Sequence, residues 1–168
     1  MTKLRKLEIK DMQGMLEWMH DEEIMKCFRM NRASEEKIKI FIENSFDNEN
    51  KHYAIVDDQD DYLGTISLKH IDEKNGNAEY AIVLRRKAMG SGVAKEATRQ
   101  LLEIAFKELK LNKIYLNVLS ENKRAIGFYK KMNFKFEGEF KQHLRMNESY
   151  VDLSWYAIYK EDYVNARV

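Results

Sequence analysis

The stretch Met89-Gly90-Ser91-Gly92-Val93-Ala94 decides the fold expected for this chain. It follows residues 78–84, an apolar run of strand length, and it precedes residues 97–109, where apolar side chains recur at helical spacing. A strand that ends in a glycine turn and leads into a helix leaves backbone N–H groups unpaired at the helix N-terminus, where the helix dipole adds positive charge. We therefore expect a phosphate or diphosphate group to bind at this turn.

The spacing of the glycines argues against two common nucleotide motifs. A dinucleotide fingerprint, GxGxxG, would need a third glycine where Lys95 stands. The phosphate loop of nucleotide hydrolases would need GxxxxGK followed by Ser or Thr, which is also absent. The turn thus predicts an anion, but neither a nicotinamide cofactor nor ATP.

Composition points to an ordinary globular protein. The 168 residues are 44% hydrophobic and 34% charged, with a formal net charge of +1. Such a balance gives no reason to expect nucleic acid or an anionic membrane as the main partner, so we expect small-molecule partners. The chain has no proline, no Ser/Gly-rich linker and no visible repeat, and we expect residues 1–168 to form a single domain.

Cysteine and histidine usage predicts a metal-free protein. Cys27 is the single cysteine, which excludes an intramolecular disulfide, and the four histidines lack the spacing of metal ligands. The basic N-terminus is not followed by the apolar core of a signal peptide, and nothing approaches the ~20 apolar residues of a membrane span. We therefore expect a cytoplasmic location.

The remaining patterns predict the order strand, two helices, three strands, helix, strand, helix, two strands. An Asn75-Gly76 pair favours a hairpin before the central strand. We expect helix N-caps at Asp11, at Ser34, and at Ser120 or Asn122. The expected strands cover residues 4–9, 52–56, 62–71, 78–84, 113–118, 134–140 and 150–159, and the longest helix ends near Lys110. This order predicts an α+β fold with a mixed, mostly antiparallel central sheet of about seven strands flanked by four helices.

With this order, the chain resembles the GNAT superfamily of acyl-CoA-dependent N-acyltransferases over most of its length. The glycine turn matches the family motif Gln/Arg-x-x-Gly-x-Gly/Ala, and residues 122–134 look like the family's Asn-x-x-Ala-x-x-Phe-Tyr-x-Lys-x-Gly-Phe segment. Met89 and Asn133 depart from these patterns. Asn tolerates positive φ and can replace glycine at a helix C-terminus, while Met89 is expected to fix the turn less firmly without abolishing binding.

The resemblance implies direct transfer of an acetyl group from acetyl-CoA, as co-substrate, to an amine. It also implies a central strand splayed from its neighbour, with a backbone N–H near Ile82 or Val83 meeting the oxyanion. The residues expected to contact acetyl-CoA are Ile82, Val83, Leu84, Met89, Gly90, Ser91, Gly92, Val93, Ala94, Asn117, Asn122, Phe128 and Lys131.

Two residues are expected to carry the chemistry. Tyr129 matches the family's tyrosine; a phenol with a pKa of about 10 can protonate a leaving thiolate within hydrogen-bond reach. The alternative interpretation is that Tyr129 is only a core aromatic of a short helix. Glu79 is the candidate base for the amine, directly or through a water, and its other reading is a solvent-facing strand carboxylate.

The acceptor is expected between the first two helices and the closing strands, lined by Trp18, His20, Glu22, Tyr150 and Asp152. The acidity of these segments suits a cationic amine. Residues 136–152 resemble the branch that holds ribosomal-protein, spermidine and amino-sugar acetyltransferases. We expect a small-molecule amine, an amino sugar or a polyamine. The alternatives are a protein N-terminus as acceptor and a non-catalytic acyl-CoA-binding module, and a homodimer is possible for any of these.

Overall fold

The structure, a computed structural model, describes residues 1–27 and 32–166. The strands are β1 (Lys3–Lys6), β2 (Lys51–Val56), β3 (Tyr62–Asp72), β4 (Asn77–Leu84), β5 (Lys113–Leu119), β6 (Lys135–Met146) and β7 (Ser149–Tyr159). The α-helices are α1 (Met12–Met19), α2 (Glu22–Met25), α3 (Glu35–Glu43), α4 (Val93–Glu103), α5 (Lys123–Lys131) and α6 (Lys160–Ala166).

All strands join one seven-stranded sheet in the order β1-β2-β3-β4-β5-β7-β6. Neighbouring strands are antiparallel except β4 and β5, which are parallel. That parallel pair needs a crossover, which the glycine turn and α4 supply. The expected α+β class with a mixed, mostly antiparallel sheet is confirmed.

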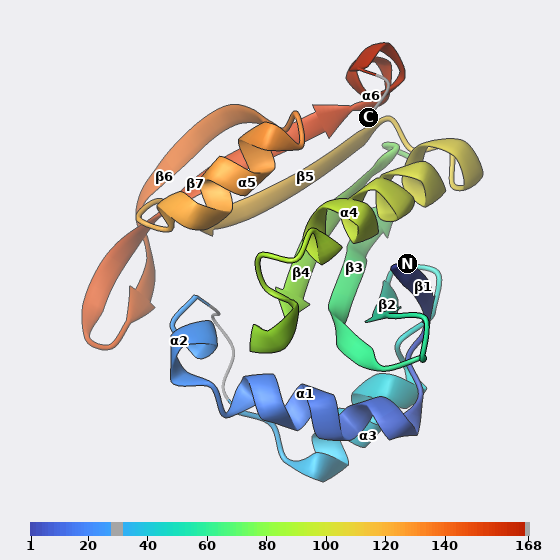
Figure 1. The fold of residues 1–168 in the computed structure, drawn as a ribbon. Helices are drawn as coiled ribbons and strands as arrows, with labels where there is room; N and C mark the ends of the chain where they lie inside the picture. Colours follow the sequence, from blue (N-terminus) through green and yellow to red (C-terminus); the bar gives the residue numbers. More distant parts are fainter. Residues whose placement is uncertain (28–31, 167–168) are drawn as a thin grey trace.

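Helices cover the two faces of the sheet at different places (Figure 1). Helices α4 and α5 pack on one face, where Leu101, Leu102 and Ile126 join the buried residues of β3, β4, β5 and β7 in the larger core. Helices α1, α2 and α3 pack on the other face, where Met15 and Ile38 join residues of β2 and β3 in a second core. We call these the α4–α5 face and the α1–α3 face.

The predicted elements are present, with two additions. Helices α2 and α6 were not expected; with four and seven residues they are too short to show a helical period in the sequence. Helix α4 ends at Glu103 and continues as a π-helix over Ile104–Glu108, so helical backbone stops close to the expected end at Lys110, whose φ is 57°. No helix among residues 1–27 and 32–166 has the length and apolarity needed to cross a membrane.

The N-terminal elements differ from the prediction at their ends. Strand β1 stops at Lys6, and Asp11 does not cap α1 with its side chain. The Asp11 carboxylate turns back instead: it accepts bonds from both Nη atoms of Arg5 at 2.8 Å and from the N–H of Glu8 at 2.9 Å. A charged guanidinium forms stronger hydrogen bonds to a buried carboxylate than a neutral helix amide does, so Asp11 binds Arg5 instead of capping α1. The Ser34 cap is confirmed, with Oγ 3.4 Å from the N–H of Lys37.

Candidate active site

The glycine turn has the geometry of an anion site. Gly90 and Gly92 have φ angles of 79° and 88°, which other residues adopt rarely. A Cβ on either glycine would meet no heavy atom within 4 Å, so the space in front of the turn is open. Among the described residues no acceptor binds the amides of residues 91–95, which point out of the N-terminus of α4. These groups fit the diphosphate expected here.

Side chains fix this turn from both sides. Ser91 Oγ donates a 2.7 Å hydrogen bond to the carbonyl of Ala88. Met89 packs against the core of the α1–α3 face, while Val93 packs against the core of the α4–α5 face, and Ala94 is half-buried. The methionine that departs from the family pattern therefore anchors the turn by apolar contact rather than by a polar side chain.

Strands β4 and β5 stop pairing before the chain reaches the glycine turn. Their pairing covers Asn77↔Lys113, Ala78↔Ile114 and Glu79↔Tyr115, while both strands continue to Leu84 and Leu119. We call the opening between residues 80–84 of β4 and residues 116–119 of β5 the fork; it is visible in Figure 1. The splay that the resemblance implies is thus present.

The alternating direction of N–H groups along β4 shows which amide points into the fork. Arg85 N–H donates to the carbonyl of Leu63 on β3 at 2.8 Å. Because backbone groups alternate along a strand, the N–H of Val83 also points to β3, and the N–H of Ile82 points into the fork. Leu84 shares the orientation of Ile82. Of the two oxyanion donors left open by the sequence, the geometry favours Ile82.

Tyr129 lies on α5 with its ring at the closed end of the fork. Its ring meets Tyr80 edge-on, with centroids 5.9 Å apart and an interplanar angle of 86°. Phe134 and Phe128 lie beside it at 5.9 and 5.6 Å. Burial, with a smaller contribution from Cys27, raises the pKa of Tyr129 to about 12. The hydroxyl is therefore protonated at any working pH, as a proton donor must be.

Glu79 points to the other face of the sheet, because it precedes Tyr80 on the same strand. Its side chain is 13% exposed and forms an ion pair of 2.8 Å with Lys69 on β3, with His70 Nε2 at 3.8 Å. Glu79 and Tyr129 are therefore not brought into contact. If both act on one substrate, they act from opposite faces.

The remaining predicted acetyl-CoA contacts lie on α5, at its N-cap and on β5. Asn122, not Ser120, caps the helix: its Oδ1 accepts the N–H of Ala125 at 3.1 Å. Phe128 packs against the core and Lys131 is exposed. Asn133 has φ 64°, in agreement with its expected role in place of glycine. On β5, Asn117 pairs in register with Trp155 of β7.

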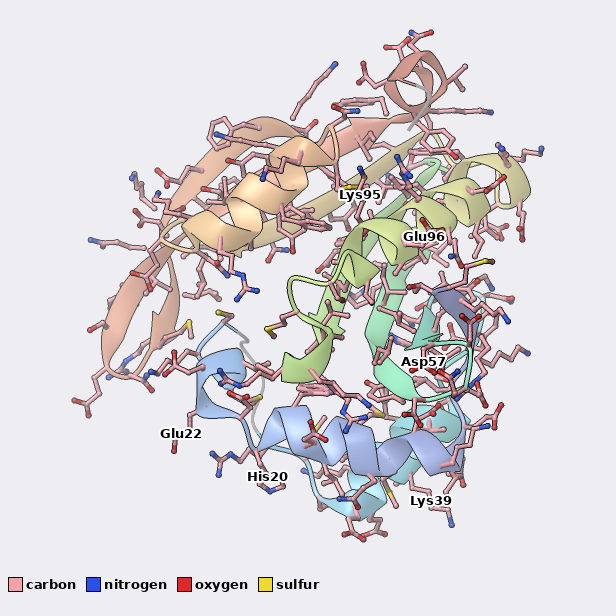
Figure 2. All side chains as sticks on the ribbon, viewed as in Figure 1. His20, Glu22, Lys39, Asp57, Lys95 and Glu96 are labelled. Atoms are coloured by element: carbon pink, nitrogen blue, oxygen red, sulfur yellow. The ribbon has the colours of Figure 1, made fainter. Side chains whose placement is uncertain are left out.

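The predicted acceptor residues near α1 and α2 do not share one environment: Trp18 is buried, whereas His20 and Glu22 are exposed. Trp18 is 4% exposed and packs in the core of the α1–α3 face, where its Nε1 donates to the Tyr62 hydroxyl at 3.2 Å. The expectation that Trp18 lines an open site is thus corrected: the helical period that turns Met15 and Met19 inward also turns Trp18 inward. Figure 2 shows His20 and Glu22 projecting outward, away from the sheet.

The two acceptor candidates on β7 lie near the tip of the β6–β7 hairpin. Tyr150 is 63% exposed. Asp152 is half-buried and holds the hairpin, accepting bonds from Lys141 Nζ at 3.0 Å and from the N–H of Gln142 at 2.7 Å. These bonds lower the pKa of Asp152, with the Gln142 amide as the main cause. Asp152 therefore stays ionised but is engaged within its own hairpin.

Two arginines that the sequence interpretation missed join the glycine turn to the α1–α2 corner. Arg85 binds the Glu17 carboxylate and the carbonyl of Tyr62, the latter at 2.8 Å. Arg86 binds both oxygens of Asp21 at 2.7 Å, and Asp21 also caps α2. The Arg86 bond lowers the pKa of Asp21. The adjacent arginines after the central strand were the signal available in the sequence.

The comparisons with known proteins agree with this geometry. The acetyltransferase (GNAT) domain model matches residues 2–135. An N-acetyltransferase of unassigned substrate from Bacillus subtilis is 31% identical over 162 residues, covering 95% of this chain and 94% of that protein. Spermidine N(1)-acetyltransferase from Vibrio cholerae is 26% identical over 164 residues, covering 96% and 95%.

The fold also matches a solved structure along its whole length. The crystal structure of spermidine N-acetyltransferase from Vibrio cholerae in complex with CoA and spermine superposes with a TM-score of 0.89 at 26% identity, covering 98% of each chain. The chain belongs to the acetyltransferase (GNAT) domain family and is an acetyl-CoA-dependent N-acyltransferase.

Proposed function

We propose that this enzyme acetylates a primary amine of a polyamine by direct attack of the amine nitrogen on the thioester carbonyl of acetyl-CoA. The observation that carries the proposal is the fork, in which the N–H of Ile82 points toward a space bordered by the glycine turn and Tyr129. The relatives that act on spermidine support the polyamine among the small-molecule acceptors expected.

In the proposed reaction a C–N bond forms and the thioester C–S bond breaks. Negative charge on the carbonyl oxygen is met by the Ile82 N–H, a donor that needs no reorganisation. Tyr129 gives its proton to the leaving thiolate. A phenol with a pKa of about 12 is a weak acid, but the same burial raises the pKa of the thiol, so that the transfer stays feasible.

The amine must lose a proton before or during the attack. A polyamine nitrogen has a pKa of about 10.4 and is almost wholly protonated at neutral pH. Glu79 is the proposed acceptor of this proton, through a water. Its bond to Lys69, with Nζ and Oε1 2.8 Å apart, orients the carboxylate.

The test is acetyl-CoA consumption with release of free thiol over a panel of amines: spermidine, spermine, a nucleotide-linked amino sugar, free amino acids and a ribosomal-type N-terminal peptide. Turnover of the polyamines above the other amines supports the proposal. Turnover of the peptide alone would favour the protein N-terminal acetyltransferase. Acetyl-CoA binding without turnover of any amine would favour the non-catalytic module and contradict the proposal.

Three further expectations accompany this function. We propose that residues 1–168 act as one catalytic domain, because a single sheet takes strands from both ends of the chain. We propose a cytoplasmic location, where acetyl-CoA is available. We also propose a homodimer, since the outer edge of β6 carries Phe136 and Phe140, which are 56% and 49% exposed. Light scattering of the purified protein tests the last.

A further inference from the structure

A buried hydrogen-bonded pair joins β4 to α4 directly behind the fork. Tyr80 is 2% exposed and Thr98 is fully buried, and their hydroxyl oxygens are 2.8 Å apart. Thr98 Oγ1 also lies 2.7 Å from the carbonyl of Ala94 in the first turn of α4. Because Thr98 has one proton to donate and the carbonyl can only accept, Tyr80 is the donor to Thr98. The chain of bonds therefore runs from Tyr80 through Thr98 to Ala94.

Tyr80 stands at the point where β4 and β5 part. The last paired residue of β4 is Glu79, so Tyr80 is the first residue of the fork. Its ring meets the ring of Tyr129 edge-on at 5.9 Å and that of Phe134 at 5.6 Å. Tyr80 is thus linked through Thr98 to the first turn of α4, and its ring contacts the ring of the proposed proton donor.

Strand pairing alone does not fix the position of Tyr80 relative to α4. Beyond Glu79, β4 is paired only on its β3 side, so the relative position of β4 and α4 depends on side chains that cross between them. Packing of apolar side chains is non-directional, whereas a hydrogen bond fixes both distance and angle. Burial holds the pKa of Tyr80 well above its usual range, so its hydroxyl remains a neutral donor.

We propose that Tyr80 is a positioning residue of the active site: its hydrogen bond to Thr98 sets the first turn of α4 and the ring of Tyr129 relative to the fork. Tyr80 itself touches neither substrate. The proposal deepens the proposed function and rests on it for the role of Tyr129. It assigns to the Tyr80–Thr98 bond an effect on turnover and on acetyl-CoA affinity, beyond any effect on folding.

The test uses Tyr80→Phe and Thr98→Val, which remove the bond while preserving shape. Each variant is expected to lower kcat about 5- to 10-fold and to weaken CoA binding, measured by calorimetry, about 3-fold, the size of effect expected from losing one neutral hydrogen bond. The double variant is expected to be no worse than either single one, because both remove the same bond. Thr98→Ser keeps the hydroxyl and is expected to restore both values.

The matched control is Tyr62→Phe on the α1–α3 face. The Tyr62 hydroxyl is also buried and bonded to a threonine, Thr65, at 2.7 Å. Tyr62→Phe is expected to lower the melting temperature about as much as Tyr80→Phe does, with kcat and CoA affinity unchanged. If Tyr80→Phe and Thr98→Val lower only the melting temperature, as the control does, the proposal is overturned.

CoA calorimetry separates this proposal from the proposed function. If wild-type protein binds CoA but acetylates none of the amines, the proposed function fails, and the positioning role is decided by whether Tyr80→Phe and Thr98→Val weaken CoA binding while Tyr62→Phe does not. If wild-type protein does not bind CoA, both are overturned. If the double variant loses as much as the two single variants added together, the bond is not the shared cause and the proposal is overturned.

Discussion

A buried tyrosine–threonine hydrogen bond lies on each face of the sheet: Tyr62–Thr65 on the α1–α3 face and Tyr80–Thr98 on the α4–α5 face. The two bonds connect different kinds of elements. Tyr62 and Thr65 lie on the same strand, β3, where a register shift opposite Ile55 and Val56 lets both side chains face α1. Neighbouring strands pair with β3 on both sides, so their positions are fixed without that bond. Tyr80 and Thr98 instead connect a strand to a helix where the ladder has ended.

This difference teaches where a buried polar pair influences function. On the α1–α3 face the hydroxyl bond satisfies two polar groups within a rigid ladder, and its loss costs about 1 kcal/mol of stability. On the α4–α5 face a bond of the same type lies beside Tyr129 and is linked to the first turn of α4, and we propose that its loss also moves the reacting groups. Of these two pairs, we therefore expect turnover to be sensitive to the one on the α4–α5 face and insensitive to the one on the α1–α3 face.

The largest expected effect is that of Tyr129→Phe on the α4–α5 face. Loss of the proton donor should lower kcat by about 10²- to 10⁴-fold, with CoA affinity nearly unchanged, because the ring remains and the anion site is made of backbone amides. Steady-state kinetics with the best amine, together with CoA calorimetry, measure both. Tyr163→Phe, which alters another aromatic packed on the same core, is the control and should keep full activity. Equal activity of the two variants would remove Tyr129 from the mechanism.

The next effect tests whether the α1–α3 face contributes chemistry. Glu79→Gln should lower kcat/KM at neutral pH about 10- to 100-fold for a strongly basic amine, and the loss should shrink as pH rises toward the pKa of the amine, about 10.4. A pH–rate profile of both enzymes checks this. Glu137→Gln, which alters a strand carboxylate paired with Lys113 at 2.7 Å, is the matched control. A constant ratio across pH would contradict the role as base.

A smaller effect is expected where Arg86 joins the glycine turn to the α1–α2 corner. Arg86→Met breaks the bond to Asp21 while leaving Asp21 as the cap of α2, and we expect about a 3- to 5-fold rise in KM for the acceptor with little change in KM for acetyl-CoA. Because Arg86 is 63% exposed, stability should hardly change. Lys87→Met, which removes the neighbouring exposed pair with Asp61, should have no effect on either KM. An equal effect of both variants would argue against this link.

The smallest effect concerns acid stability of the α1–α3 face. Burial, with Lys69 as a second cause, lowers the pKa of His52 from 6.5 to about 4. The folded protein therefore binds this proton less readily than the unfolded chain, and the stability present above pH 6.5 is lost as pH falls from about 6.5 to about 4.

The slope from this one group should be at most about 1.4 kcal/mol per pH unit. Urea denaturation of wild type and His52→Gln at pH 7 and pH 5 measures it, and the variant should lose less between the two. His20→Gln, on the exposed surface, should behave like wild type. A His52→Gln variant as acid-sensitive as wild type would contradict the assignment.

Much of the fold could be predicted because its signals are local. The Asn75-Gly76 turn, the glycine turn and the apolar period of residues 97–109 each act over a few residues. The structure has a hairpin, a turn with two glycines at positive φ, and α4 at these places. Tyr129 and Asn122 were identified by resemblance to a family motif, and the Asn122 cap is present. The role of Tyr129 stays a prediction.

The missed features depend on contacts between distant segments. Whether Asp11 caps a helix or binds Arg5 is decided by where β1 brings the arginine. Trp18 was expected to line the acceptor site, although its period with Met15 turns it into the core. The fork was expected only from the family resemblance, because the end of pairing between β4 and β5 is a property of the assembled sheet. Tyr80 and Thr98 were likewise visible only as core residues.

The fork and the glycine turn have a consequence for how this enzyme tolerates sequence drift. The proposed oxyanion donor and the diphosphate ligands are main-chain amides, which every residue except proline carries. Side chains at Ile82 or Val93 are therefore free to change with the packing around them while the main-chain donors persist. A proline at position 82 would be the single substitution there that deletes the donor rather than its surroundings.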